Sequence, residues 1–413
     1  MLGGLTTRGR CLLAAGFAAG VCALVLDERD LLRVAVFVVA LPLVSAWLAG
    51  RTRHGLAAQR DVAPARIPVD SEASVRVRVT GYGRLPLGGM LLEDEVPPAL
   101  GDRPRFVLDR FPGRQGVDLE YTIRPALRGM HRIGPLWTRI GDPFGMSEFS
   151  QELGGRTRVV AVPHVVPLGD LPPGSGLGLG EDGSTRLRAG HGDDDVMVRE
   201  YRHGDDMRRV HWKSTAHRDE LMVRVEERPW HGGVTVLVDR RAAAHRGSGR
   251  SSSLEWAISA TASICSHLHK HGQQVRLVTA DGAVLAGGGG DSDGGHDENK
   301  VLDALAALQP ATQRDLACDL DPGHGRELIA VLGAVSAGGV HELTRSRPPG
   351  VRSQALLLDV GQWSDGGEDN DTAATAHRLR AAGWTVAVVE GRTGSMAAAW
   401  AELCRAGRAT GVG

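Results

Sequence analysis

The sequence has few lysines and few aromatic residues, and its cysteines are scattered. Only three of its 48 basic residues are lysines and the formal net charge is −1, so no overall field draws the chain to nucleic acid. The excess of arginine, alanine and glycine indicates the codon bias of a G+C-rich genome rather than phosphate recognition. The five cysteines have no CxxC spacing, so nothing supports a disulfide framework or a zinc site.

The common catalytic motifs are also missing. There is no GxSxG nucleophile elbow, no HExxH pair and no Walker sequence, so catalysis lacks an obvious nucleophile. Alternating glycines in residues 169–198 resemble a phosphate loop, but no strand precedes them and no Gly-Lys-Ser/Thr follows. We therefore predict a flexible linker there.

Residues 1–50 contain two apolar segments, Leu12–Leu26 and Leu31–Leu48, separated by the short acidic loop Asp27–Asp30. A membrane span needs about 17 to 25 residues, so the second segment fits and the first is short. A signal peptide is the alternative, but a second apolar segment follows at once and no small-residue cleavage pattern ends the first. The sequence thus favours a transmembrane helical hairpin.

Basic residues flank the outer ends of this hairpin, with Arg8 and Arg10 before it and Arg51 and Arg53 after it. Because basic flanks stay on the cytoplasmic side, both termini are predicted to be cytoplasmic. The expected location is the cell membrane, with the soluble domains in the cytoplasm.

Residues 60–168 show the period-two alternation of half-buried strands. Strands are expected at Ser74–Val79, Met90–Leu92, Phe106–Leu108, Val117–Ile123, Leu136–Ile140 and Arg158–Val162. Short strands at this spacing favour a small sandwich or open barrel. The domain is either a binding module or a spacer that holds the rest of the chain off the membrane.

Residues 228–413 alternate between buried strand patterns and helix patterns, which is typical of a doubly wound parallel sheet. Strands are expected at Val234–Asp239, Val275–Thr279, Ala355–Asp359 and Trp384–Glu390, and helices at Ser252–His271, Val301–Leu308, Glu327–Val335, Ala373–Ala382 and Ser395–Ala406. The glycine-rich stretch Gly287–Asn299 reads as a loop. The whole chain is therefore predicted to be α/β, with a β-rich middle domain.

Two groups of residues in this domain could bind a metal. Asp239 and Asp359 end predicted strands, so both should lie at the carboxyl edge of the sheet and could hold Mg²⁺. His267, His269 and His271 are spaced along one helix end, where the helix dipole alone favours them. The two aspartates are the weak metal candidates that we retain.

Residues 199–227 are the densest in charge and aromatic character. The candidate docking residues in this signature segment are Arg199, Glu200, Tyr201, Gly204, Asp205, Asp206, Arg208, His211, Trp212 and Arg218. Their acids can cap a short helix at Met207–Ser214, and their cations can pair with the acids. Three readings stay open: a clasp between domains, a docking surface for an anion or a protein, and a metal or hydrolytic site using His203, Asp205, His211 or His217.

The signature segment resembles that of the domain of unknown function 58 family. The matching residues are Arg199-Glu200-Tyr201, Gly204-Asp205, Arg208, Val210-His211-Trp212, Ala216, Leu221 and Val223-Arg224, with Arg128-Gly129, Gly134-Pro135 and Asp142-Pro143-Phe144-Gly145 as further elements. His217 and Val225 depart from the pattern, and Arg218 and Glu226 follow each by one place.

The resemblance implies a membrane-anchored protein with a von Willebrand factor A-like domain, in a family often encoded beside MoxR-type AAA+ ATPases. Such domains carry an Asp-x-Ser-x-Ser metal site after the first strand, whereas this chain has Asp239 followed by Arg240-Arg241-Ala242-Ala243. The expectation is a non-enzymatic scaffold or adaptor without a cofactor, possible Mg²⁺ aside. A metal-dependent hydrolase is the alternative, and the oligomeric state stays open.

Overall fold

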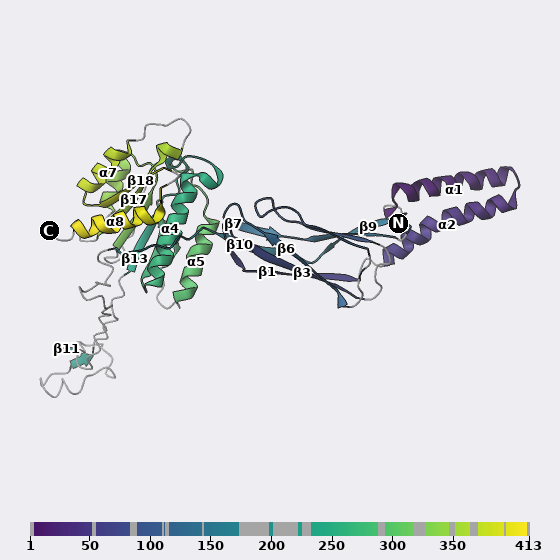
Figure 1. Ribbon diagram of the computed structural model, residues 1–413, viewed down its shortest axis with the longest axis horizontal. Coiled ribbons are helices and arrows are strands. Elements are labelled where there is room, and N and C mark those ends of the chain that lie inside the picture. Colours follow the sequence, from purple (N-terminus) through teal and green to yellow (C-terminus); the bar gives the residue numbers. More distant parts are fainter. Residues whose placement is uncertain are drawn as a thin grey trace. The chain divides into compact units, whose positions relative to one another are not determined.

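The protein is described here by a computed structural model. It covers residues 4–51, 55–82, 89–109, 111, 115–142, 144–172, 198–200, 222–224, 233–287, 294–316, 327–346, 352–363, 371–391 and 394–410. The chain divides into two compact units (Figure 1). One comprises residues 1–164 with 302–308, and the other comprises residues 165–301 with 309–413.

The first unit begins with a helical hairpin formed by α1 (Thr7–Val25) and α2 (Arg29–Arg51). The Thr6 hydroxyl accepts a hydrogen bond from the Gly9 amide at 3.3 Å and so caps α1. Glycine lets the helices approach closely, since a Cβ on Gly16 would lie 2.8 Å from Val39. Both helices are long and apolar enough to cross a membrane by length and composition. The helix α1 is longer than its apolar segment, which is short for a span in the sequence.

The described residues between 55 and 164 of the first unit form ten strands. They are β1 (Leu56–Ala63), β2 (Arg66–Pro68), β3 (Ala73–Gly81), β4 (Met90–Asp94), β5 (Arg105–Leu108), β6 (Val117–Ile123), β7 (Gly129–Ile133), β8 (Leu136–Gly141), β9 (Glu148–Leu153) and β10 (Thr157–Val162). They form three sheets, with orders β1-β3-β6, β2-β10-β7 and β5-β4-β8-β9. In β3 the alternation is clear, because Val75, Val77 and Val79 are buried in the shared core. All six strands predicted here are confirmed.

A buried ion pair connects these sheets. Arg60 of β1 donates from Nε to Asp94 of β4 at 3.0 Å, and Tyr121 of β6 donates to the same carboxylate at 2.6 Å. Arg60 also donates to the carbonyls of Ile133 and Gly155. With Asp94 fully buried and paired, this cluster satisfies polar groups that an apolar core could not.

The second unit contains a six-stranded sheet of order β15-β14-β13-β16-β17-β18. Its strands are β13 (Gly233–Val238), β14 (Gln274–Thr279), β15 (Val284–Ala286), β16 (Glu327–Leu332), β17 (Ser353–Asp359) and β18 (Thr385–Glu390). All pair in parallel except β15, which is antiparallel at the edge. The central strands are buried along nearly their whole length, as parallel strands covered on both faces should be.

Helices pack against this sheet. They are α4 (Ser253–Lys270), α6 (Ala337–Arg345), α7 (Thr372–Ala381) and α8 (Met396–Thr410). α5 (Gly294–Ala307) follows β15 in the chain, and its last residues, from Leu302 on, belong to the first unit. α4 contacts β13, β14 and β16, while α8 contacts β17 and β18. On the other side, α6 and α7 supply Val340, Leu343, Ala376 and Leu379 to a core shared with Leu237 and Leu357. The predicted capping of α4 is confirmed, since Ser252 Oγ accepts from Glu255 N at 3.2 Å.

Two predictions in this unit are wrong. The segment expected to be a helix at Glu327–Val335 is the central strand β16, ending at Leu332. A short apolar run does not distinguish a doubly buried strand from a buried helix, which explains the error. The loop expected at Gly287–Asn299 is also wrong in part, because α5 already begins at Gly294.

Candidate functional site

The signature segment begins and ends in a small antiparallel ladder. Strand β11 (Val198–Glu200) pairs with β12 (Met222–Arg224), so that Arg199 lies opposite Val223 and Glu200 opposite Met222. The strand expected around Leu221–Val225 is therefore present at Met222–Arg224. The other predicted docking residues lie outside the described residues: Tyr201, Gly204, Asp205, Asp206, Arg208, His211, Trp212 and Arg218.

The carboxyl edge of the six-stranded sheet is the second candidate site, and it carries both predicted aspartates. Asp239 directly follows β13, and Asp359 is the last residue of β17. The edge also receives Arg240 and Arg241 from the segment after β13, and Asp281 from the turn after β14. Ligands of parallel α/β sheets usually bind at this edge, so its geometry decides what chemistry the unit can perform.

Asp239 is paired with an arginine of its own loop. Arg241 donates from Nε to Oδ1 at 2.9 Å and from Nη2 to Oδ2 at 2.7 Å, a bidentate arrangement. The Asp239 side chain is fully buried and that of Arg241 is 6% exposed. Two more guanidinium hydrogens go to the carbonyls of Arg314 and Ala334, both at 3.0 Å. The buried charge of Asp239 is thus neutralised, and four of the five guanidinium hydrogens of Arg241 are bonded within the protein.

This arrangement does not fit a divalent cation at Asp239. Both carboxylate oxygens already accept charge-assisted hydrogen bonds from Arg241, and the Arg241 amide donates to Oδ1 as well, at 3.1 Å. A metal ion would have to displace a buried guanidinium of the same sign of charge. Oxygen ligands must be free to approach Mg²⁺ to about 2.0–2.1 Å, which the pair prevents.

Asp359 is held by different partners. Its Oδ2 accepts from Gln362 Nε2 at 2.9 Å and its Oδ1 accepts from Thr372 Oγ1 at 3.0 Å. Strand β16 lies between β13 and β17, so the two strands that end in the aspartates are about 10 Å apart, twice the usual strand spacing. The structure brings Asp239 and Asp359 to the same edge but gives each carboxylate its own contacts.

His245 contacts the backbone of Asp239, and no pattern in the sequence distinguishes this histidine. Its Nε2 is 2.8 Å from the Asp239 carbonyl oxygen and its Nδ1 is 3.1 Å from Ser253 Oγ. Because a carbonyl only accepts, the neutral ring carries its proton on Nε2 and accepts from Ser253. Burial lowers the pKa of His245, which favours that neutral form. Ser253, the first residue of α4, is fully buried, so its contact with His245 connects the segment after β13 to the start of α4.

Arg240 and Asp281 form a second ion pair beside the first. Arg240 Nη2 lies 2.6 Å from Asp281 Oδ2, and Thr279 donates to the other oxygen. Burial alone would raise the pKa of Asp281, but the hydrogen bonds from Arg240 and Thr279 outweigh it and lower the pKa. Two successive arginines thus each neutralise one acid at this edge.

The histidines at the end of α4 serve mainly to end the helix. His269 and His271 each place Nδ1 2.8 Å from a carbonyl of the last turn, those of Cys265 and His267 respectively. His267 is buried against Trp400 and His271, and burial lowers its pKa. Within the described residues, no group of three or more His, Cys, Asp or Glu side chains is placed to hold a metal ion.

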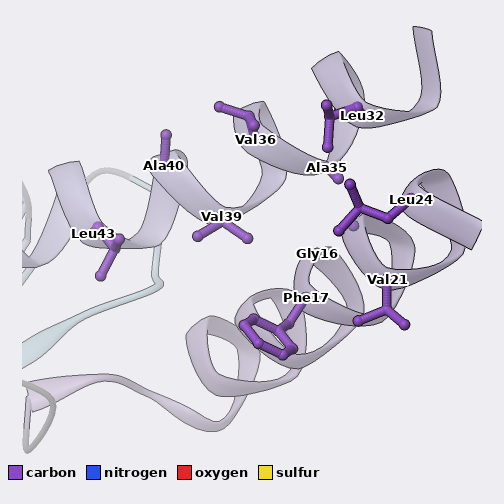
Figure 2. A pocket seen from close by; sticks show the side chains of 11 residues that line it. Gly16, Phe17, Val21, Leu24, Leu32, Ala35, Val36, Val39, Ala40 and Leu43 are labelled. Atoms are coloured by element: carbon purple, nitrogen blue, oxygen red, sulfur yellow. The ribbon is translucent and has the colours of Figure 1, made fainter. Parts of the chain in front are cut away.

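An apolar groove of about 390 Å³ runs along the hairpin between α1 and α2 (Figure 2). Its eleven lining residues are all aliphatic, aromatic or glycine, among them Gly16, Phe17 and Val21 from α1 and Val36 and Val39 from α2. Nothing in this lining can donate or accept a proton. The groove therefore suits hydrocarbon and not polar chemistry.

Among solved structures, the similarities are distant. A CARDB domain of the PF1109 protein from Pyrococcus furiosus has 18% identity and a TM-score of 0.20, covering 28% of this chain and 96% of that one. The alkylpurine DNA glycosylase AlkC of Pseudomonas fluorescens has 15% identity and a TM-score of 0.16, covering 31% of this chain and 39% of its own. No curated protein matches the chain. The model of the family described as protein of unknown function DUF58 matches residues 197–327, which span the signature segment, and this match supports the family resemblance.

Proposed function

We propose that the protein is a membrane-anchored, non-enzymatic adaptor that works with a MoxR-type AAA+ ATPase in the assembly or maturation of protein complexes. The hairpin holds the chain in the membrane with the β-rich domain and the α/β domain in the cytoplasm. The α/β domain is of the von Willebrand factor A type and presents the signature segment to the partner.

The observation that carries the proposal is the Asp239–Arg241 pair. The acid that heads the carboxyl edge of the sheet has both oxygens bound by an internal guanidinium. A metal-dependent adhesion site or a hydrolase needs an acid with free oxygens, whereas both oxygens of Asp239 are bound by Arg241. The buried Ser253 is likewise out of reach of any substrate. Protein recognition by a surface away from this edge suits such a domain better than catalysis.

Two further features support the membrane part of the proposal. α1 has 19 residues and α2 has 23, and both keep many large apolar side chains exposed, such as Phe17 at 74% and Phe37 at 65%. Apolar side chains that a soluble unit would bury are stable at this exposure in hydrocarbon. The partner class comes from the family resemblance of the signature segment.

The test is recovery of the ATPase from native membranes with the full chain as bait. Three baits are compared: the native chain, a signature variant carrying Arg208→Ala and Trp212→Ala, and the matched control Arg378→Ala, an exposed arginine on α7. The proposal expects a MoxR-type ATPase with the native and control baits and its loss with the signature variant. Equal recovery with all three baits, or none with any, contradicts the proposal.

The hydrolase alternative is separated by metal analysis of the purified chain. One equivalent of bound metal in the native chain, lost in both Asp205→Ala and His211→Ala, favours a metal-dependent enzyme over the adaptor. The adaptor predicts no stoichiometric metal in any of the three proteins.

A further inference from the structure

The function proposed above leaves unused one turn of the β-rich domain, residues Asp142 and 144–147. Asp142 organises it: its Oδ2 accepts from the Phe144 amide at 3.1 Å and its Oδ1 from the Ser147 amide at 2.6 Å. Gly145 adopts a positive φ of 67° that closes the turn. Although these bonds fix the backbone, the Phe144 ring is 60% exposed. The chain has only six phenylalanines, so a rigid turn that holds one in solvent needs an explanation.

The turn is attached to the first residues of the hairpin. The Thr6 amide donates to the Met146 carbonyl at 2.9 Å, and the Thr6 hydroxyl donates to the Gly145 carbonyl at 2.8 Å. Leu5 forms a bridge with Ser147. The turn therefore lies beside the start of α1, which begins at Thr7.

The start of α1 lies at the level where the membrane surface must be. The apolar stretch of α1 begins at Cys11, five residues after Thr6, and a helix rises 1.5 Å per residue, so Thr6 is about 7 Å outside the hydrocarbon. The headgroup layer on each side of a bilayer is about 5–8 Å thick. Gly145 and Met146, which Thr6 contacts, consequently lie at that layer whenever the hairpin spans the bilayer, and Phe144 is the residue next to Gly145.

Side chains on both helices mark the same level. Gly16 faces Val39 and Gly20 faces Ala35. The two helices are antiparallel, so each step of one residue toward the C-terminus of α1 corresponds to a step of one residue toward the N-terminus of α2. Arg8 is eight residues before Gly16 on α1, and Trp47 is eight residues after Val39 on α2. Arg8 and Trp47 therefore lie at the same height along the hairpin. Trp47 is 51% exposed and the Arg8 guanidinium lies close to Gly145. A tryptophan, an arginine and an exposed phenylalanine at one level are typical of a membrane interface.

We propose that the turn formed by Asp142 and residues 144–147 is a phospholipid contact, in which Phe144 inserts among the headgroups while Arg8 and Arg10 bind lipid phosphates. The contact ties the base of the β-rich domain to the bilayer and fixes its orientation at the membrane surface. Phospholipid is the occupant because the turn is continuous with the hairpin, which brings it to the headgroup layer together with two cations. The inference rests on the proposed membrane insertion of the hairpin.

The test places the photo-crosslinking amino acid p-benzoylphenylalanine at single positions of the full chain in vesicles of phosphatidylglycerol and phosphatidylcholine. Position 144 is the probe and position 17, on the exposed face of α1, is the membrane control. Position 72 is the matched exposed control. Glu72 lies just before β3, at the end of the strand that is farther from the hairpin. The nine residues of β3 span about 30 Å from there toward the hairpin.

We expect lipid adducts at positions 17 and 144 and no adduct at position 72. Replacing phosphatidylglycerol by phosphatidylcholine should lower the yield at position 144 but not at position 17, because only the former depends on Arg8 and Arg10. Adducts at 17 without any at 144, or an adduct at 144 to a second copy of the chain, overturn the lipid contact while leaving the hairpin in the membrane. Absence of adducts at 17 overturns the membrane proposal itself.

Discussion

The guanidinium of Arg241 closes on the carboxylate of Asp239 through two parallel hydrogen bonds, 2.9 Å from Nε to Oδ1 and 2.7 Å from Nη2 to Oδ2. Both side chains are buried, so each charge depends on the other. The pair stands where a parallel α/β sheet most often binds its ligand. At this edge of the sheet, Asp239 therefore stabilises the fold through Arg241 and has no oxygen free to bind a ligand.

Replacing Arg241 by methionine should strongly destabilise the α/β unit, because Asp239 is then left charged and buried without its partner. Removing one member of a buried pair costs about 3–5 kcal/mol. Chemical denaturation of the detergent-solubilised chain, followed by tryptophan fluorescence, measures the loss. Arg378→Ala, a change of an exposed arginine, should leave stability within about 0.5 kcal/mol. Equal stability of the two variants would show that Arg241 does not neutralise Asp239.

The stability of this unit should fall as the pH falls below about 6.5, the ordinary pKa of histidine. Burial lowers the pKa of His245 in the folded state. As the pH falls, the unfolded chain is therefore protonated at this histidine before the folded chain is. Stability contributed by neutral His245 is therefore complete above the unfolded pKa and is lost toward acid. His245→Gln keeps a donor for the Asp239 carbonyl and should flatten the slope of stability against pH between 6.5 and 5. Parallel slopes for the variant and the native chain would contradict this role.

Glu327 should make the stability of this unit fall as the pH rises, which is opposite to the effect of His245. Its Oε2 is buried and has no hydrogen-bond partner among the described residues, and burial raises its pKa from 4.5 to about 7 against the charge of Arg352. The folded state favours the neutral acid, so its stability falls as the pH rises from 4.5 to 7. Glu327→Gln should raise the free energy of unfolding at pH 8 by about 1–3 kcal/mol and leave it nearly unchanged at pH 4. An equal effect at both pH values would point to packing instead.

In the β-rich domain, Tyr121→Phe should cost about 1.5–3 kcal/mol, since it removes a buried hydrogen bond to the charged Asp94 without changing the ring. The exposed pair Arg78–Asp118 on the same β3–β6 ladder provides the comparison. Arg78→Ala should change the thermal unfolding midpoint too little to measure, because exposed pairs are screened by solvent. If both variants unfold at the same temperature, Asp94 does not rely on Tyr121.

Much of this fold follows from the periodicity of the sequence. Alternating valines and arginines predict β3, and the run that ends at Asp239 predicts β13, because both patterns are set by which faces are buried. β16 was misassigned as a helix, since residues buried on every side leave no period to read. Edge strand β15 has three residues, too few for any pattern.

The sequence predicts where the aspartates at the carboxyl edge of the sheet lie, but it does not predict which residues they contact. Strand ends at Asp239 and Asp359 place both acids at one edge, but their partners depend on tertiary contacts. Arg241 could have been suspected as the partner of Asp239, because a charge two residues away in a turn can reach back to it. His245 could not, since it contacts the backbone of Asp239, and every residue has a carbonyl.

If Arg241, and not a metal ion, neutralises Asp239, the domain works without metal chemistry at this edge. Equilibrium binding of Mn²⁺ to the full chain, read from the electron paramagnetic resonance signal of the free ion, measures this directly. We predict no saturable site in the native chain at millimolar Mn²⁺. One site per chain that disappears in Asp239→Asn would contradict it.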